Sequence, residues 1–101
     1  MEKTFYIAGV QFHELKNVIK DLKEGDDLQL VLEPQNKYDP NAVRIEYFNE
    51  GEETMCGYVP KKFSAEVSGA IAIGKVLECK ITQLAPSAKP WEQCQVTVKE
   101  V

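Results

Sequence analysis

Apolar positions recur in short runs separated by polar turns, and the first two runs differ in their period. Residues 4–10, TFYIAGV, are rich in aromatic and β-branched residues, which favours a strand. In residues 12–22 the apolar side chains recur at helical spacing, which predicts a short amphipathic helix. These side chains are Phe12, Leu15, Val18, Ile19 and Leu22.

The middle of the chain alternates between apolar and polar residues, the pattern of half-buried strands. Residues 27–33 place three leucines on one face, and residues 54–59 form a shorter run after the turn signal NEGEE. Residues 42–48 alternate in the same way, and we expect Arg44 and Glu46 to face solvent there. Three successive antiparallel strands are therefore predicted.

The rest of the chain predicts one more helix and two more strands. Residues 60–72 begin with Pro60, whose missing N–H is tolerated in a first helical turn, and Gly74 is expected to end the helix. Residues 76–84 and 91–101 are predicted strands on either side of a loop that contains prolines and a serine.

Together these elements predict a single domain over residues 1–101, mainly β, with about six strands and two short α-helices. Short antiparallel strands of this number usually curl into a barrel, because closure removes exposed strand edges. We therefore expect a small, partly open β-barrel that resembles an OB-fold.

The charge is distributed unevenly along the chain. Residues 1–55 carry 6 basic and 12 acidic side chains, a net of −6, whereas residues 56–101 carry 6 basic and 4 acidic ones, a net of +2. The total of −4 argues against bulk electrostatic binding of duplex nucleic acid. An anion is more compatible with the second half than with the first, although each single lysine there is more typical of a solvated surface. The lysines in question are Lys61, Lys62, Lys75 and Lys89.

The cysteines and the start of the chain indicate a reducing, cytoplasmic setting. Cys56, Cys79 and Cys94 have no metal-binding spacing, and no signal peptide is recognisable, so we expect reduced thiols. Cys79 and Cys94 lie in alternating apolar runs and are expected in the core. No apolar run is long enough to span a membrane.

Few residues suit catalysis. His13 is the single histidine, and the chain has neither a Gly-rich phosphate loop nor a hydrolase Ser or Cys motif. Asn36, Asp39 and Asn41 loosely resemble cation ligands, but the glycine and glutamate of an EF-hand are missing. We therefore expect a binding module rather than an enzyme, with no metal, no cofactor and no small-molecule substrate.

The turn EPQNKYDPNAVRI, residues 33–45, holds the most suggestive residues of the chain. Pro40 favours an extended backbone at Asp39, and Asn36 can hydrogen-bond the local backbone, so Tyr38 and Asp39 are expected to be held rigidly. A fixed tyrosine can stack a nucleobase, and a carboxylate beside it can accept a hydrogen bond from a sugar hydroxyl. Alternatively, Asp39 caps backbone N–H groups and Tyr38 packs on the core.

Three motifs carry a resemblance to a known family: FYIAGVQFH, then EPQNKYDPNAVRI, then GYVPKKFSAEV. In order and spacing, over essentially the whole chain, they resemble the HIRAN domain. That family occurs in helicase-like transcription factor, in related fork-remodelling translocases and as stand-alone bacterial proteins. The resemblance implies a modified OB-like barrel that binds single-stranded DNA and captures its free 3′-hydroxyl end, in DNA repair or replication-fork processing. A stand-alone member would act with a helicase or nuclease partner.

The resemblance also implies which residues contact DNA. Tyr38 and Asp39 match the family pair that stacks on the end base and hydrogen-bonds the terminal hydroxyl. Lys61 matches a backbone phosphate contact. The full set implied by the motifs is Gln11, Phe12, His13, Tyr38, Asp39, Asn41, Tyr58, Lys61 and Lys62.

Two positions depart from the family pattern. Members that bind 3′ ends usually carry a basic residue where Gln11 stands and a histidine where Tyr58 stands, so two potential phosphate contacts are neutral here. This departure and the acidic first half of the chain keep a second hypothesis open. In that hypothesis the chain is a protein-interaction or regulatory domain that keeps the fold without binding DNA ends.

Overall fold

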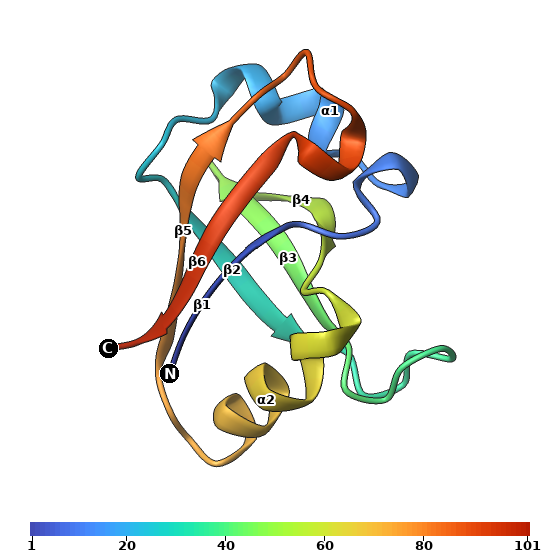
Figure 1. The fold of residues 1–101 in the computed structure, drawn as a ribbon, viewed down its shortest axis with the longest axis vertical. Helices are drawn as coiled ribbons and strands as arrows, with labels where there is room; N and C mark the ends of the chain where they lie inside the picture. The colour runs from blue at the N-terminus through green and yellow to red at the C-terminus, as the bar shows by residue number, and fades with distance from the viewer.

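Six antiparallel strands form one strongly curved sheet in the computed structural model, which describes residues 1–101 (Figure 1). The strand order is β1-β6-β5-β2-β3-β4. The strands are β1 (Glu2–Tyr6), β2 (Asp27–Leu32), β3 (Val43–Asn49), β4 (Glu52–Tyr58), β5 (Leu77–Leu84) and β6 (Cys94–Glu100). The helices are α1 (Leu15–Val18) and α2 (Lys61–Ala72), with 3₁₀ turns η1 (Val10–Phe12), η2 (Ile19–Asp21) and η3 (Pro90–Glu92). The predicted class, six strands with two short helices, is confirmed.

The core lies on the concave side of this sheet, where alternate strand residues point inward. Cys79, Ile81, Cys94, Val96 and Val98 are all buried on the paired strands β5 and β6. The predicted core positions of the two cysteines are therefore confirmed. Burial raises the pKa of Cys94 to about 12, so this thiol stays protonated at neutral pH.

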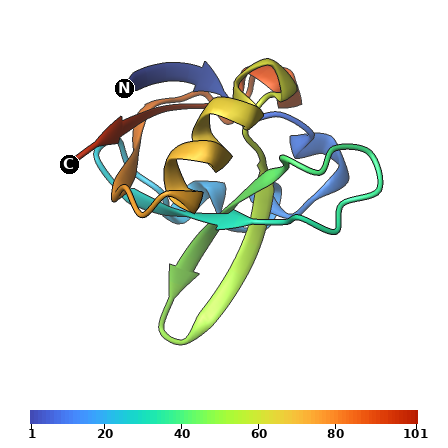
Figure 2. The same ribbon diagram turned by 90° about the horizontal axis from the view of Figure 1, so that it is seen from below.

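Helix α2 lies at one end of the curved sheet and covers the opening there (Figures 1 and 2). Val67 is completely buried, and the Phe63 ring packs against Phe5 of β1 with 5.8 Å between ring centroids. Pro60 is the N-cap, and Gly74, with φ of 89°, follows the end of the helix as expected. The helix thereby begins directly after β4, beside the end of that strand.

One antiparallel bridge joins the two edges of the sheet. Just after β1, Ala8 donates its N–H to the carbonyl of Tyr58 and accepts the Tyr58 N–H, both at 2.8 Å. The sheet therefore has the curvature of a barrel but is not closed into one, because β1 and β4 form no continuous ladder beyond this single bridge.

Gly57 makes this bridge sterically possible. A Cβ at position 57 would overlap the carbonyl oxygen of Ala8 and would lie 2.6 Å from Cγ2 of Ile7. The hydrogen atom of glycine leaves room for the two backbones to approach. The register of β3 and β4 also shifts here, since Ile45 pairs with Gly57 and the next residue pairs with Met55. Such a bulge is common beside functional sites.

The prediction of a first strand over residues 4–10 is wrong at both ends. Strand β1 covers only Glu2–Tyr6. The chain then separates from β6, and Ala8 forms its bridge with Tyr58 at the opposite edge of the sheet. Gly9 then adopts a left-handed conformation with φ of 69°, which turns the chain away from the sheet.

The predicted helix over residues 12–22 is also wrong in its length. The α-helical part is only Leu15–Val18, because Glu14 donates its N–H to Met55 of β4 and Val18 leaves helical geometry at φ −123°. Phe12 lies on η1 before the helix and is 78% exposed, so it is not part of the apolar face.

The expectation that Glu46 faces solvent is contradicted. Glu46 is buried, and its Oε2 accepts a hydrogen bond from Nε of Arg44 at 2.9 Å. Both residues lie on one face of β3 because they are two positions apart. Arg44 covers the carboxylate and satisfies its charge, which makes the burial tolerable.

We predict opposite effects from adding a methyl group at two glycines. Gly57→Ala should lower the free energy of unfolding by roughly 1–3 kcal/mol, because the added Cβ forces the edge bridge apart. Gly69→Ala on α2 should raise it by about 0.5–1 kcal/mol, because a Cβ there meets no atom and alanine favours the helix. Urea unfolding of both variants measures this difference, and equal stability would contradict the role given to Gly57.

Candidate functional site

A cleft of about 300 Å³ lies where the edge bridge, the 33–42 turn and the start of α2 meet. Its lining comes from three parts of the sequence: the chain after β1, the turn, and the end of β4 with the first residue of α2. Nine residues line it: Ala8, Gly9, Asn36, Tyr38, Asp39, Ala42, Tyr58, Val59 and Lys61. The edge bridge thus forms one wall of the cleft and the turn forms the other.

The amide of Asn36 holds the turn together. Its Oδ1 accepts the backbone N–H of Tyr38 at 2.8 Å and that of Asp39 at 3.0 Å. Asp39 in turn accepts the N–H of Asn41 on Oδ1 at 2.9 Å, and Ala42 donates its N–H to the Asp39 carbonyl. Four backbone N–H groups of the turn are therefore bonded locally, three of them by side-chain oxygens as in Asx turns.

Tyr38 and Asp39 face different surroundings within this turn. The Tyr38 side chain is 88% exposed, so the alternative in which it packs on the core is contradicted. Asp39 accepts the hydroxyl hydrogen of Ser64 on Oδ2 at 2.7 Å. The capping role expected of Asp39 is present, but it leaves acceptor capacity on both carboxylate oxygens.

The pKa of Asp39 lies below its ordinary value of 3.8. Its largest cause is the hydrogen bond from Ser64, followed by the backbone hydrogen bond from Asn41, with a smaller attraction from Lys61. Asp39 is therefore a carboxylate at neutral pH, and it can only accept hydrogen bonds.

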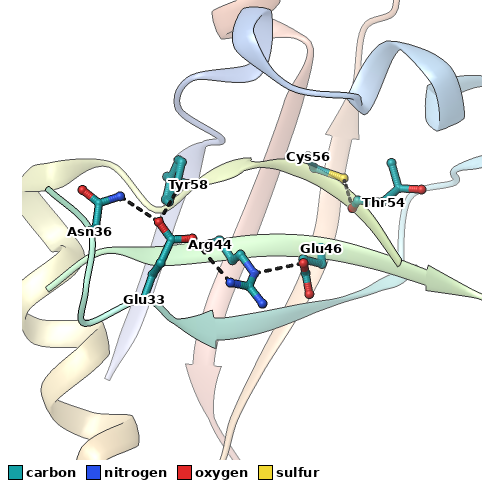
Figure 3. A network of polar contacts seen from close by, with 7 residues as sticks. All are labelled: Glu33, Asn36, Arg44, Glu46, Thr54, Cys56 and Tyr58. Carbon is teal, nitrogen blue, oxygen red and sulfur yellow. Dashed lines mark hydrogen bonds and ion pairs between the residues drawn. The ribbon is translucent and has the colours of Figure 1, made fainter. Parts of the chain in front are cut away.

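A second carboxylate, that of Glu33 at the base of the turn, lies among the side chains of Asn36, Tyr58 and Arg44 (Figure 3). Its Oε1 accepts hydrogen bonds from Nδ2 of Asn36 and from the hydroxyl of Tyr58, both at 2.7 Å. Nη1 of Arg44 lies 3.4 Å from its Oε2. Partial burial by itself raises the pKa of Glu33, but the hydrogen bonds from Asn36, Tyr58 and Arg44 outweigh it and lower the pKa below 4.5.

Lys61 is the cation of the cleft. It is exposed at the first position of α2 and takes part in none of the ion pairs of the chain. The ammonium of Lys62 instead lies over the Phe63 ring, 5.1 Å from its centroid, and does not line the cleft. Lys75, another lysine considered for anion docking, is paired with Glu100.

The structure brings together four of the nine residues predicted for the site: Tyr38, Asp39, Tyr58 and Lys61. The other five do not line the cleft. Gln11 and Phe12 are exposed on η1, Asn41 contributes only its backbone N–H, and Lys62 lies outside. The His13 ring is half-buried and contacts Tyr58 edge-on, with 5.4 Å between centroids.

Two residues of this arrangement were missed by the sequence prediction, Glu33 and Ser64. Each bonds a partner 25 positions away in the chain, so no local pattern marks it. Glu33 does precede Pro34 at the end of a predicted strand, which marks the start of the turn. Ser64 lies one helical turn after Lys61, a spacing that places both on one face of α2.

Other kinds of site find little support in the geometry. No group of three or more His, Cys, Asp or Glu side chains is placed to hold a metal ion. None of the helices is both long and apolar enough to cross a membrane.

Comparison with known proteins places this chain in a family. The family model of the HIRAN domain matches residues 3–100. A Fanconi-associated nuclease 1 homolog from Oryza sativa subsp. japonica is 35% identical over 74 residues, which is 73% of this chain and 7% of the nuclease homolog. This chain therefore spans only a small part of that relative's length.

Two solved structures share the fold. The crystal structure of the HIRAN domain of human HLTF matches 98% of this chain and 74% of that one, with a TM-score of 0.75 and 12% identity. A protein from Lactobacillus plantarum matches 99% of this chain and 97% of its own, with a TM-score of 0.79 and 16% identity.

These matches define the class as a binding domain built on a curved antiparallel sheet. The chain belongs to the HIRAN domain family, whose members are DNA-binding modules that occur with nuclease-like and helicase-like proteins.

Removing the Ser64 hydroxyl should raise the pKa of Asp39 toward 3.8, because it removes the largest cause of the lowered value. Carboxyl carbon NMR titration of Ser64→Ala measures the shift. Ser68→Ala is the matched control, because Ser68 lies one turn after Ser64 on α2 and its hydroxyl donates to the carbonyl of Ala65 instead of to Asp39. An unchanged Asp39 titration in Ser64→Ala would contradict the assignment.

Asp39 also makes the stability of the fold depend on pH. Because the pKa of Asp39 is lowered by folding, its hydrogen bonds stabilise the fold fully above pH 3.8. This contribution is lost as the pH falls through the folded-state pKa, and Ser64→Ala should weaken that dependence.

Proposed function

We propose that this chain is a non-enzymatic module that captures the free 3′-hydroxyl end of single-stranded DNA in the Tyr38–Asp39 cleft. The observation that carries the proposal is an ionised, held carboxylate beside an exposed tyrosine at the mouth of a cleft. The family's DNA-binding character is consistent with it.

The carboxylate of Asp39 can accept a hydrogen bond from a hydroxyl group, whereas its charge repels a phosphate. An ionised carboxylate donates no hydrogen bond, so it pairs with a ligand group that carries a hydrogen, such as a terminal 3′-hydroxyl. A 3′-phosphate brings negative charge to the same place and meets repulsion. Because Ser64 and Asn41 hold Asp39 in place, little ordering is left to occur on binding.

Tyr38 and Lys61 provide the sequence-independent part of recognition. The exposed Tyr38 ring offers a face for the terminal base, and base–aromatic stacking contributes on the order of 1–3 kcal/mol. Lys61 lines the same cleft and makes no ion pair, so its ammonium can bind a backbone phosphate of the bound strand. One lysine gives a weak electrostatic contribution, in keeping with the acidic chain.

The biological setting we propose is cytoplasmic DNA repair or replication-fork processing, with a helicase or nuclease as partner. The similarity to a Fanconi-associated nuclease homolog supports a nuclease partner. The module would present the end, and the partner would supply the chemistry.

Two substitutions test the cleft by fluorescence anisotropy with short single-stranded oligonucleotides at low salt. Tyr38→Ala should weaken binding of a 3′-hydroxyl end roughly 5- to 150-fold, the equivalent of losing one stacked base. Asp39→Asn should reduce the preference for a 3′-hydroxyl over a 3′-phosphate by about tenfold or more, because the neutral amide repels phosphate less.

Matched controls lie outside the cleft. Phe48→Ala removes another exposed aromatic on β3, and Asp27→Asn removes another exposed carboxylate on β2, so both should bind as the wild type does. Equal wild-type affinity for the two kinds of 3′ end, or for a circular oligonucleotide, would contradict end capture.

A further inference from the structure

The Glu33 carboxylate connects three segments that meet beside the cleft. It accepts hydrogen bonds from Asn36 in the turn, from Tyr58 at the end of β4 and from Arg44 on β3 (Figure 3). Two of these donors share the single oxygen Oε1 at 2.7 Å. Glu33 itself does not line the cleft, whereas Asn36 and Tyr58 do, so Glu33 acts through these neighbours.

We propose that Glu33 and Tyr58 are positioning residues that select the orientation of the Asn36 amide and thereby hold Tyr38 and Asp39 ready for the DNA end. The consequence for DNA rests on the function proposed above. The effect on the turn itself does not, because it concerns the protein without any ligand.

The first step of the argument is the orientation of the amide. The Asn36 side chain presents an acceptor on one side and a donor on the other. An ionised carboxylate can only accept, so Glu33 takes the Nδ2 group and leaves Oδ1 facing the N–H groups of Tyr38 and Asp39. With the amide reversed, donors would face donors on the turn side and acceptors would face each other on the Glu33 side.

The second step is the single proton of the Tyr58 hydroxyl. That proton is donated to Glu33 Oε1, so the hydroxyl has no second hydrogen to offer a phosphate. Tyr58 therefore lines the cleft without donating a hydrogen bond into it, because its hydroxyl hydrogen is bonded to Glu33 at the base of the turn. This accounts for a neutral tyrosine at a position where the family resemblance implied a phosphate contact.

The third step is the anchoring of both partners by the backbone. Tyr58 is held by its bridge to Ala8 across the sheet edges. Glu33 is held at the base of the turn, because its N–H bonds the Ala42 carbonyl at 2.9 Å and its carbonyl accepts the Asn36 N–H at 3.0 Å. The hydrogen bond between the two side chains thus links the edge bridge to the apex of the turn.

The test measures amide hydrogen exchange by NMR in the DNA-free protein. In Tyr58→Phe and in Glu33→Gln, the amides of Tyr38 and Asp39 should exchange about tenfold faster or more, the effect of losing a charge-assisted hydrogen bond. Amides of β6, such as those of Val96 and Val98, should be unchanged. Tyr47→Phe is the matched control, because it removes a hydroxyl from a half-buried tyrosine of β3 that makes no bond to Glu33.

The same substitution made in the Asn36→Ala variant separates an effect on the Asn36 amide from a general loss of stability in the turn. In Asn36→Ala the acceptor for both amides is already gone, so adding Tyr58→Phe should accelerate their exchange no further. Unchanged exchange of the two amides in Tyr58→Phe, or additive effects in the double variant, would overturn the proposal. Tyr58→Phe removes one oxygen atom, so this arm stands even if Glu33→Gln fails to fold.

A DNA arm distinguishes failure of this inference from failure of the proposed function. Where the wild type binds 3′-hydroxyl ends, Tyr58→Phe should weaken that binding several-fold and reduce the preference over a 3′-phosphate, whereas Tyr47→Phe should change neither. Faster exchange in Tyr58→Phe together with a wild type that binds no DNA would support the positioning pair and overturn DNA-end capture.

Discussion

The antiparallel bridge between Ala8 and Tyr58 is the contact on which the rest of the structure depends. It joins the two edges of a sheet that otherwise stays open, and it places the chain after β1 against the end of β4. Gly57 allows the approach because it has no Cβ. Without the bridge, Ala8 and Tyr58 would not form a wall opposite the 33–42 turn, and the cleft would have one side only.

An acidic domain can still bind nucleic acid when its charges are placed individually. The carboxylates of Glu33 and Asp39 are each held by hydrogen-bond donors, and Lys61 is left free at the cleft. In the function proposed above, such a site would depend on stacking and on one directed hydrogen bond more than on bulk attraction, so its affinity should vary less with salt than that of a basic groove. The same proposal favours the end of a strand over its interior, because only the end offers the hydroxyl.

The sequence predicted what local patterns determine. Alternating apolar and polar residues, with aromatic and β-branched residues near the start of the chain, identified the six strands. The turn residues identified Tyr38 and Asp39 as a fixed pair. Phe12 was misplaced because the helical spacing of apolar residues begins before the helix itself, which starts only after Glu14 has donated its N–H to Met55 of β4. Glu46 was misplaced because its burial depends on cover by Arg44. Glu33 and Ser64 were missed because their hydrogen bonds with Tyr58 and Asp39 each span 25 residues, and only the folded chain brings these partners together.

The most direct test of the account is the structure of this domain bound to a short single-stranded oligonucleotide with a free 3′ end. The account predicts that the terminal base stacks on Tyr38 and that the terminal hydroxyl lies within hydrogen-bond distance of the Asp39 carboxylate, with the turn unchanged. An oligonucleotide bound over another face, or an internal nucleotide in the cleft with the 3′ end free in solvent, would contradict it.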